Sequence, residues 1–296
     1  EIVRRLVGSE MCIRDSYYYI QLKDLTVVIV TFKSQKNIHS CLDTIPKDIN
    51  VLVIENSNNE KFKLDLEKKY SNVECTIIGS NKGYAVGNNI GLRKVKTKFA
   101  LILNPDTKLR KDTIDNFLLT ASNNNDFWLM GPYNDQQKNL SFNSNNVIEV
   151  NNLKGFAIFF NLMKFNEIYF DENFFLYFEE IDLCKQVKIK GGKILVDKNI
   201  IINHDGASSV ENIKKIELEK NRNWHWMWST FYYNKKYKGF LIALILIMPK
   251  LISSIAKTLF FLIIFNKGKR DIYFCRMSGI INSILGKKSW YRPSLD

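Results

Sequence analysis

Short apolar runs rich in β-branched residues recur along the first part of the chain, and segments with helical spacing separate them. Leu25–Thr31 (LTVVIVT), Val51–Glu55, Cys75–Ile78 and Phe99–Leu103 are such runs. A short continuous apolar run is typical of a strand buried on both faces. Strands that alternate with helices form mostly parallel sheets with helices on both faces. The alternation therefore predicts a doubly wound α/β fold.

The intervening segments supply the helices. Helices are expected after Ser34, over Lys61–Tyr70, through Val86, Ile90 and Val95, through Ile114–Ala121, and over Glu179–Lys190 before Gly191. Further strands are expected at Gly155–Phe160, Ile194–Val196 and Ile200–Asn203, and loops at the Asn-rich stretches Asn123–Asn125 and Asn143–Asn146.

The positive charge is concentrated in the C-terminal part of the 296 residues. Residues 221–296 contain 13 Lys and Arg but two acids, and they carry +11 of the net +13. The first 220 residues are therefore nearly neutral. We predict an α/β domain over residues 24–220, a basic, aromatic and apolar helical extension over 221–296, and an artefactual or disordered leader over 1–23.

The leader is expected to lie outside the fold. Residues 1–16 (EIVRRLVGSEMCIRDS) resemble a translated sequencing adapter, and they have no apolar run long enough for a signal peptide. We expect this segment to pack against nothing. The five cysteines form no C-x-x-C pair, which favours reduced thiols in the cytoplasm over a disulfide framework or a structural zinc site.

The most apolar segment is Gly239–Phe265, which is long enough to span a bilayer. Pro249 and the two lysines Lys250 and Lys257 interrupt it, so we expect two helices in the membrane interface rather than one span or a buried hairpin. The preceding aromatics (Trp224, Trp226, Trp228, Phe231, Tyr232, Tyr233) and the basic Lys235–Lys238 segment are typical of an anchor on an anionic leaflet. We also expect several of these aromatics to pack on the α/β domain instead. Aromatics with basic residues also occur in nucleic-acid sites, but the interleaved apolar residues favour a membrane surface and no nucleic-acid partner.

Three polar clusters follow the second, third and fourth predicted strands. They are Glu55–Asn59, Ser80–Asn89 and Leu103–Thr107. In open parallel sheets, ligands bind in the crevice beyond the carboxyl ends of the strands. We therefore expect a ligand site at this edge of the sheet.

The clusters contain residues suited to a nucleotide and a metal ion. Gly83 and Gly87 let the backbone approach a nucleotide, and the following helix N-terminus favours phosphate, although glycines after a strand are also ordinary turn residues. Asp106 is either a helix cap or an oxygen ligand for Mg²⁺ or Mn²⁺ bridging a diphosphate. His204 is the best metal-ligand candidate among the three histidines, whereas His39 and His225 are expected to be structural or solvated.

A fourth polar cluster begins the predicted helix at Glu179. Glu179, Glu180 and Asp182 crowd its first turn behind the aromatic segment Phe170–Phe178. Acids at this position stabilise a helix through its dipole. Neighbouring carboxylates and partial burial also raise a carboxyl pKa toward the range of a general base. The pattern leaves both interpretations open.

Together these motifs resemble the family 2 glycosyltransferases, inverting enzymes of the GT-A fold, and within them the rhamnosyltransferase-like branch. The resemblance covers Leu25 to Ser209. It rests on VVIVTF, VIENS, NKGYAVGNNIGLR, LILNPDT, FDENFFLYFEEIDLC and INHDGAS in family order.

The resemblance implies roles for individual residues. Glu180 matches the catalytic base, with Asp182 and Glu179 as the alternatives, although the family usually has Asp at this position. Asn104-Pro105-Asp106 replaces the Asp-x-Asp metal motif, so Asp106 is the expected ligand of a divalent metal (Mg or Mn), with His204 completing the site. The nucleotide-sugar donor is expected to contact Thr31, Glu55 (where the family has Asp), Asn56, Asn81, Gly83, Tyr84, Gly87, Asn88, Asn104 and Gly155.

The implied activity is transfer of a sugar from a nucleotide-sugar donor to a lipid-linked or polysaccharide acceptor in bacterial surface glycan synthesis. L-rhamnose from dTDP-rhamnose is one candidate, and a galactosyl- or hexosaminyl-type transferase is the close alternative. A non-catalytic membrane-bound nucleotide-sugar-binding protein is a second alternative. A sugar-phosphate nucleotidyltransferase is disfavoured because Thr31–Ser34 lacks its Gly-rich basic signature. The expected location is the cytoplasmic face of the inner membrane, as a peripheral or monotopic protein.

Overall fold

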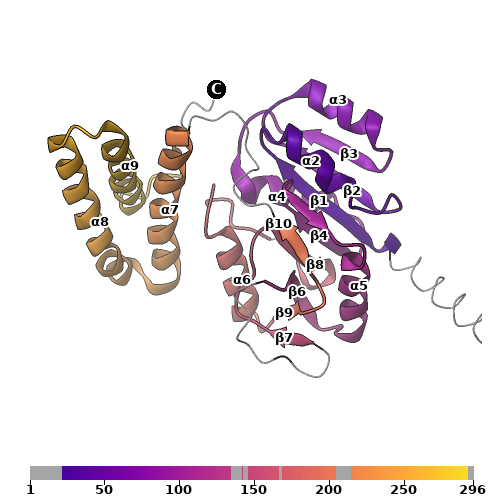
Figure 1. The fold of residues 1–296 in the computed structure, drawn as a ribbon. Coiled ribbons are helices and arrows are strands. Elements are labelled where there is room, and N and C mark those ends of the chain that lie inside the picture. Colours follow the sequence, from indigo (N-terminus) through magenta and orange to yellow (C-terminus); the bar gives the residue numbers. More distant parts are fainter. Residues whose placement is uncertain (1–21, 135–141, 143–145, 167–168, 205–214, 293–296) are drawn as a thin grey trace, which may run out of the picture. The chain divides into compact units, whose positions relative to one another are not determined.

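The computed structural model describes residues 22–134, 142, 146–166, 169–204 and 215–292 (Figure 1). The predicted adapter at residues 1–16 and residues 205–208 of the INHDGAS segment lie outside the described residues. The chain divides into two compact units. The first contains the chain up to Asn81, Gly87–Tyr169 and Leu183–Ser209, and the second contains Lys82–Val86, Phe170–Asp182 and Val210–Asp296. Three segments of the predicted domain over residues 24–220, namely Lys82–Val86, Phe170–Asp182 and residues 210–220, thus belong to the second unit.

The first unit is built on an eight-stranded sheet of order β3-β2-β1-β4-β8-β6-β9-β7. Its strands are β1 (Leu25–Thr31), β2 (Asn50–Glu55), β3 (Val73–Ile77), β4 (Phe99–Leu103), β6 (Phe127–Pro132), β7 (Val147–Glu149), β8 (Ala157–Asn161) and β9 (Lys193–Asp197). Strands β1 to β4 are mutually parallel, and β6 is parallel to β9. Strand β8 runs antiparallel between β4 and β6. The predicted mostly parallel α/β sheet is confirmed, although the sequence analysis missed β6 and β7.

Helices cover both faces of this sheet. They are α2 (Gln35–Leu42), α3 (Glu60–Lys69), α4 (Gly83–Lys94), α5 (Thr113–Asn123) and α6 (Glu179–Ile189). Val27 and Ile29 of β1 join one core with the buried side chains of α2 and α5. On the opposite face, a Cβ at Gly91 of α4 would lie 2.4 Å from the Cγ1 atom of Val28. Because α4 approaches this closely, β1 is buried on both sides, which explains its continuous apolar sequence.

The second unit contains helices α7 (Lys215–Lys238), α8 (Phe240–Ile263) and α9 (Lys267–Ile284). Figure 1 shows α8 and α9 as an antiparallel pair beside α7. Trp224, Trp228 and Phe231 of α7 are buried in the cores of this unit. The indole of Trp228 donates to the carbonyl of Lys287 (3.0 Å). The interpretation of these three aromatics as a membrane anchor is therefore wrong, because α8, α9 and the segment after α9 cover them.

Helix α8 continues through Pro249, so the predicted break into two helices is also wrong. Proline removes one backbone donor at a local cost of about 3 kcal/mol, but the Leu- and Ile-rich turns on either side remain helical. By length and composition α8 could cross a membrane, and 17% of its most apolar window is buried. A helix that is so little covered is not part of a buried core hairpin, which was the alternative expected from sequence.

The four cysteines in the described chain, Cys41, Cys75, Cys184 and Cys275, are buried free thiols. Burial raises the pKa of Cys41 to about 11. A thiol with such a pKa is protonated and unreactive at neutral pH. The described cysteines therefore act as small core residues.

Candidate active site

Most of the predicted ligand-binding residues of the first unit follow the carboxyl ends of its parallel strands, whereas Gly155 precedes the antiparallel strand β8 and His204 ends the short strand β10 (Ile202–His204). Strands β1, β2 and β4 end at Thr31, Glu55 and Leu103. Asn56, Asn81, Gly87, Asn88, Asn104, Asp106, Gly155 and His204 belong to the same unit. Gly83, Tyr84, Glu179, Glu180 and Asp182 belong to the second unit. The predicted residues thus form two groups, and the geometry of each group is described by itself.

Glu55 is fully buried at the end of β2, and its neighbours fix its carboxylate. The hydroxyl of Thr31 donates to one carboxylate oxygen (2.7 Å). The backbone N–H of Ser57 donates to the other oxygen (2.6 Å), as does the Ser57 hydroxyl. Hydrogen bonds of this kind satisfy a buried carboxylate and hold its direction. Two residues predicted to contact the donor, Thr31 and Glu55, are therefore in direct contact with each other.

Asp106 and His204 are far apart in sequence, and a small second sheet brings them together. Strand β5 (Thr107–Leu109) pairs antiparallel with β10 (Ile202–His204), and His204 is opposite Thr107. Nε2 of His204 lies 3.3 Å from Oδ1 of Asp106. The Asp106 side chain is 2% exposed and that of His204 is 29% exposed. The two predicted metal ligands are therefore neighbours, one of them buried and the other partly exposed.

The backbone around this pair is well supported. The hydroxyl of Thr107 donates to the carbonyl of Asn104 (2.7 Å). The N–H of Asn104 donates to the carbonyl of Phe156 (2.8 Å), in the segment directly after Gly155. The ring of Phe156 stacks on His204 with the centroids 4.6 Å apart. Both side chains of the pair therefore approach each other on a fixed backbone.

The pair fits a divalent cation that takes its remaining ligands from elsewhere. Oδ1 of Asp106 is buried and accepts no hydrogen bond from the described residues. Within the same residues, no third His, Cys, Asp or Glu completes a metal cluster. Mg²⁺ in phosphate-binding sites is usually held by one or two protein ligands, with water and phosphate oxygens completing its coordination. A buried carboxylate oxygen without a hydrogen bond beside an imidazole matches that requirement.

In the second unit, the nucleotide-loop residues Gly83 and Tyr84 contact Phe175. The N–H of Tyr84 donates to the carbonyl of Phe175 (3.1 Å). Gly83 has a φ of +88°, and a Cβ there would lie 2.4 Å from that same carbonyl oxygen. Both the left-handed backbone and the close approach require glycine at this position.

The three acids occupy the first turn of α6, directly after an unusual turn. Tyr177 and Phe178 have φ values of 70° and 74°, in the left-handed region. Aromatic residues seldom adopt this conformation, and each costs about 1–3 kcal/mol. Such strain persists only where the surroundings hold it, and it occurs preferentially at functional sites. The turn therefore marks the start of α6 as a candidate reaction site.

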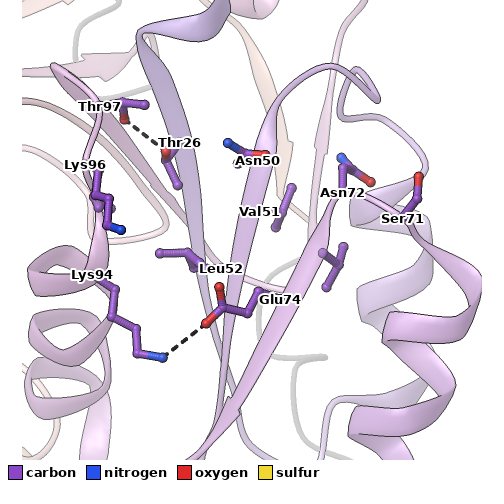
Figure 2. Close-up of a pocket in the computed structure, with 12 residues that line it drawn as sticks. Thr26, Asn50, Val51, Leu52, Ser71, Asn72, Glu74, Lys94, Lys96 and Thr97 are labelled. Carbon is purple, nitrogen blue, oxygen red and sulfur yellow. Dashed lines mark hydrogen bonds and ion pairs between the residues drawn. The ribbon is translucent and has the colours of Figure 1, made fainter.

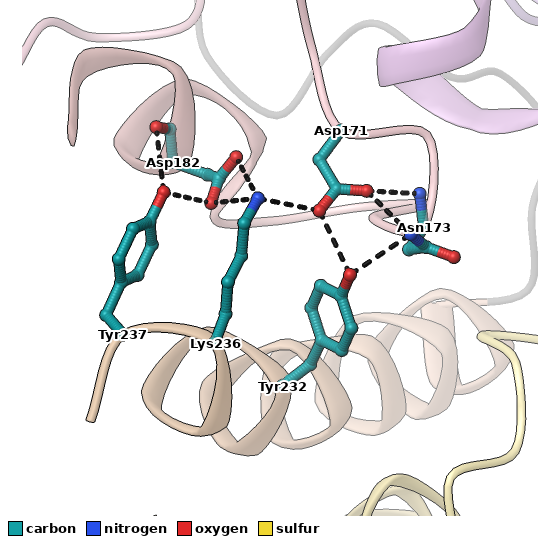
Figure 3. Close-up of polar contacts among 6 residues, drawn as sticks. All are labelled: Asp171, Asn173, Asp182, Tyr232, Lys236 and Tyr237. Atoms are coloured by element: carbon teal, nitrogen blue, oxygen red, sulfur yellow. Dashed lines mark hydrogen bonds and ion pairs between the residues drawn. The ribbon is translucent and has the colours of Figure 1, made fainter. Parts of the chain in front are cut away.

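Glu179 and Asp182 differ in their environments. Glu179 is buried, and its Oε2 atom has no hydrogen-bond partner among the described residues. Its pKa is raised well above the ordinary value, mainly by burial and secondly by the negative charge of Glu180. Asp182 is also buried, but Lys236 and Tyr237 donate hydrogen bonds to its carboxylate (Figure 3). Glu180 is partly exposed. Of the three acids, Glu180 is thus the one open to solvent.

The raised pKa of Glu179 predicts a pH dependence of stability. Because the folded pKa exceeds the ordinary 4.5, the folded protein binds more protons than the unfolded chain between the two values. Stability therefore falls as the pH rises through that window. We expect Glu179→Gln, which cannot ionise, to lose less unfolding free energy than the wild type between pH 4.5 and neutrality, measured by urea denaturation. The exposed Glu60→Gln is the control, and equal losses in all three proteins would contradict the assignment.

Sequence reasoning missed Lys236 and Asp171 as candidate site residues. The lysine run Lys235–Lys238 predicts a membrane anchor, but in the structure the ammonium group of Lys236 forms ion pairs with Asp171 and Asp182. The available signal was the spacing of Tyr232 and Lys236, which are one helical turn apart and therefore share a face of α7.

A cavity of about 360 Å³ lies at the other end of the strands (Figure 2). Thr26, Asn50 and Val73, which line it, stand at or near the amino ends of β1, β2 and β3. Lys94 forms an ion pair with Glu74 across it (3.2 Å). This cavity is separate from the carboxyl-end residues, and no residue predicted to bind the donor lines it.

Comparison with known structures supports the fold. A mannosyltransferase of Pyrobaculum calidifontis, PcManGT, solved with GDP-Man and Mn²⁺, is similar over 92% of this chain and 95% of its own, with a TM-score of 0.55 and 12% identity. The S. aureus protein TarS is similar over 87% of this chain and 55% of its own, with a TM-score of 0.52 and 14% identity. These likenesses confirm the expected GT-A fold.

Sequence comparison identifies the family. The "Low-salt glycan biosynthesis hexosyltransferase Agl10" of Haloferax volcanii is 24% identical over 207 residues, which are 60% of this chain and 66% of that protein. The chain thus spans just under two thirds of this relative. The profile described as "Glycosyl transferase family 2" matches residues 26–183, more than half of the chain. The chain therefore belongs to glycosyl transferase family 2.

Proposed function

We propose that this protein is an inverting hexosyltransferase that moves a sugar from a nucleotide-sugar donor to a glycan acceptor. The observation that carries the proposal is the Asp106–His204 pair, with a buried carboxylate oxygen that accepts no hydrogen bond from the described residues and lies 3.3 Å from an imidazole nitrogen. Asp106 follows strand β4, at the edge where open α/β sheets bind ligands, and the β5–β10 pairing brings His204 beside it. Family membership supplies the class of reaction.

The proposed reaction is a single displacement at the anomeric carbon. Glu180 accepts the proton of an acceptor hydroxyl as its oxygen forms the new glycosidic bond. The bond between the anomeric carbon and the diphosphate oxygen breaks, and the diphosphate leaves with the electron pair. Glu180 is assigned this role because it is partly exposed, whereas Glu179 and Asp182 are buried.

Asp106 and His204 are the residues that would hold a divalent cation. When bound, Mg²⁺ or Mn²⁺ supplies charge neutralisation to the leaving nucleoside diphosphate. The protein contributes the direction of the Asp106 carboxylate, and the hydrogen bonds of Thr107 and Asn104 support the backbone around it. Glu55, held by Thr31 and Ser57, and the loop around Asn81, Gly87 and Asn88 are assigned to the nucleoside.

The donor and acceptor are proposed from the motifs and the relatives. PcManGT was solved with GDP-Man, and Agl10 is described as a hexosyltransferase of glycan biosynthesis. The motif NKGYAVGNNIGLR resembles the rhamnosyltransferase-like branch, so dTDP-rhamnose is the first donor to test. UDP-galactose and UDP-hexosamines are the alternatives. A lipid-linked or polysaccharide acceptor agrees with a membrane location.

Helix α8 supports the proposed attachment to an anionic, cytoplasmic membrane surface. Leu241, Ile245, Ile252, Leu259 and Ile263 are each at least half exposed, and so large an exposed apolar surface is typical of membrane or partner contact. Lys235, Lys238, Lys267, Lys269, Lys287 and Lys288 are exposed in the same unit, and each such lysine adds about 1 kcal/mol of attraction near anionic lipid.

We expect the variant Leu241→Glu/Ile245→Glu/Ile252→Glu to lose at least about tenfold in binding to phosphatidylglycerol vesicles, because it places charges on the surface that would enter the lipid. Flotation of the purified protein with vesicles measures the effect. Leu64→Glu/Met163→Glu, which alters exposed apolar residues of the first unit, is the matched control. Equal flotation of both variants and the wild type would exclude α8 as the membrane surface.

The proposed function is tested by turnover of a donor panel. Purified protein with Mn²⁺ and a polyprenyl-diphosphate glycan would be incubated with dTDP-rhamnose, GDP-mannose, UDP-galactose and UDP-GlcNAc. Transfer from one donor, detected by product mass, is expected. Binding of a nucleotide sugar without turnover of any donor would favour a non-catalytic nucleotide-sugar-binding protein.

A further inference from the structure

The segment Asp171–Asp182 carries the proposed base and belongs to the same compact unit as α7. It contains the left-handed pair Tyr177 and Phe178 directly before Glu179 and Glu180. The N–H of Asp182 donates to the carbonyl of Phe178 (2.8 Å). The first turn of α6 is therefore connected directly to the strained turn, and a contact that fixes Asp182 also fixes the backbone that carries Glu180.

Lys236 of α7 connects the two ends of this segment (Figure 3). Its Nζ atom lies 2.8 Å from Oδ2 of Asp171. It also lies 2.8 Å from Oδ1 and 2.9 Å from Oδ2 of Asp182. We refer to Lys236 with Asp171 and Asp182 as the lysine bridge. One ammonium group thus binds two carboxylates that are separated by the whole segment.

Other side chains of α7 complete the hydrogen bonding of both carboxylates. The hydroxyl of Tyr237 donates to Asp182 (2.7 Å), and that of Tyr232 donates to Asp171 (3.0 Å). The side chain of Asp182 is fully buried, whereas that of Lys236 is 28% exposed. Removal of the lysine would leave a buried carboxylate without its cation, which is strongly unfavourable.

The charges of the bridge stabilise one another. Burial alone would raise the pKa of Asp171, but the hydrogen bonds from Lys236 and Asn173 outweigh it and lower the pKa. Burial would likewise lower the pKa of Lys236, but the hydrogen bonds to Asp171 and Asp182 raise it. Asp171 and Lys236 therefore stay charged throughout the neutral range.

The strained turn has a further contact with the same helix. The hydroxyl of Ser229 donates to the carbonyl of Leu176 (3.1 Å). The rings of Tyr177 and Phe178 pack against Trp226, each with centroids 5.3 Å apart. Helix α7 thus contacts the start, the strained turn and the end of the segment.

We propose that Lys236 is a positioning residue for sugar transfer, which acts by binding Asp171 and Asp182 and thereby directing the carboxylate of Glu180 toward the acceptor hydroxyl. This inference rests on the function proposed above. It assigns Asp182 and Asp171 to positioning rather than to proton transfer. It also gives α7 a role in the reaction besides its connection to the apolar helix α8.

The test compares Lys236→Met, which keeps the aliphatic stem, with Lys236→Arg, which keeps the cation. Lys236→Met is expected to lower kcat by about tenfold to a hundredfold, because a displacement of about 1 Å at a reacting group can cost this much. The KM for the donor nucleotide sugar is expected to stay within about threefold, and Lys236→Arg is expected to recover most of kcat. Lys190→Met is the matched control, because it removes an exposed lysine that lies outside the lysine bridge and outside the proposed membrane surface.

A triple variant tests the same proposal in case Lys236→Met does not fold. Lys236→Met/Asp171→Asn/Asp182→Asn removes the uncompensated carboxylates together with the bridge. Its kcat is expected to stay low while circular dichroism is native, and amide hydrogen exchange over residues 171–182 is expected to become faster. Wild-type kcat and wild-type exchange in this variant would overturn the positioning role alone. A wild-type protein inactive with every donor would overturn the proposed function as well.

Discussion

Glu180→Gln is expected to abolish sugar transfer while leaving nucleotide binding nearly intact. The amide keeps the size of the side chain but cannot accept the proton of the acceptor hydroxyl, and loss of a general base lowers a rate by about 100-fold to 10,000-fold. Initial rates of product formation measure the first effect, and calorimetric titration with the nucleoside diphosphate measures the second. Glu180 is partly exposed, so the substitution places no polar group in a closed core.

Glu179→Gln is the matched comparison for this prediction. Burial raises the pKa of Glu179 well above its ordinary value, so a neutral side chain at this position resembles the protonated acid. We expect Glu179→Gln to keep kcat within about tenfold of the wild type, since it lacks the direct role of a general base. If Glu180→Gln retains turnover and Glu179→Gln does not, the base has been assigned to the wrong glutamate.

Asp106→Asn is expected to remove the metal-dependent part of donor binding. The amide replaces a buried carboxylate oxygen that accepts no hydrogen bond from the described residues, and a neutral oxygen is a far weaker ligand for a hard cation. Affinity for the cognate nucleoside diphosphate should then fall by at least about tenfold in the presence of Mn²⁺, and the remaining affinity should not respond to Mn²⁺. Titrations of UDP, GDP and dTDP with and without Mn²⁺ measure both quantities.

Asp112→Asn is the control for the metal site, because Asp112 is an exposed carboxylate of the same unit. His204→Phe is expected to give a smaller loss than Asp106→Asn, since His204 is the more exposed member of the pair. Unchanged Mn²⁺ dependence in Asp106→Asn would show that the metal binds elsewhere or that donor binding needs none.

Strands could be predicted most clearly from sequence where they have apolar neighbours on both faces. Strand β1 reads LTVVIVT because Val27 and Ile29 face one core while Val28 faces α4. Strand β6 was missed although it is equally buried. Its sequence FWLMGP contains glycine and proline, which are typical of turns, and it is a strand because it has β8 and β9 as neighbours.

Site residues that lie in one sequence motif could be predicted from the sequence. Site residues that tertiary contacts bring together were harder to predict. Asp106 follows β4 and could be named from position alone. Its proximity to His204 depends on the β5–β10 pairing, in which His204 lies opposite Thr107. Lys236 could not be told from its neighbours Lys235 and Lys238, because a run of lysines does not indicate which one faces an acid.

The same limit applies to the basic C-terminal region. Its charge and its apolar segment were plain in the sequence, and helix α8 is largely uncovered. Three of its aromatics are nevertheless buried, since a tryptophan suits a membrane interface and a helical core equally well. The distinction depends on helix α9, which packs beside α7 in the folded unit.

The central claim is that this chain transfers a sugar with inversion at the anomeric carbon. The most direct test is the anomeric configuration of the product, determined by nuclear magnetic resonance of the isolated glycan after reaction with the donor that turns over. We expect one added sugar whose configuration is opposite to that of the nucleotide sugar, and no such product with Glu180→Gln. A product with retained configuration, or an equal yield from Glu180→Gln, would contradict it.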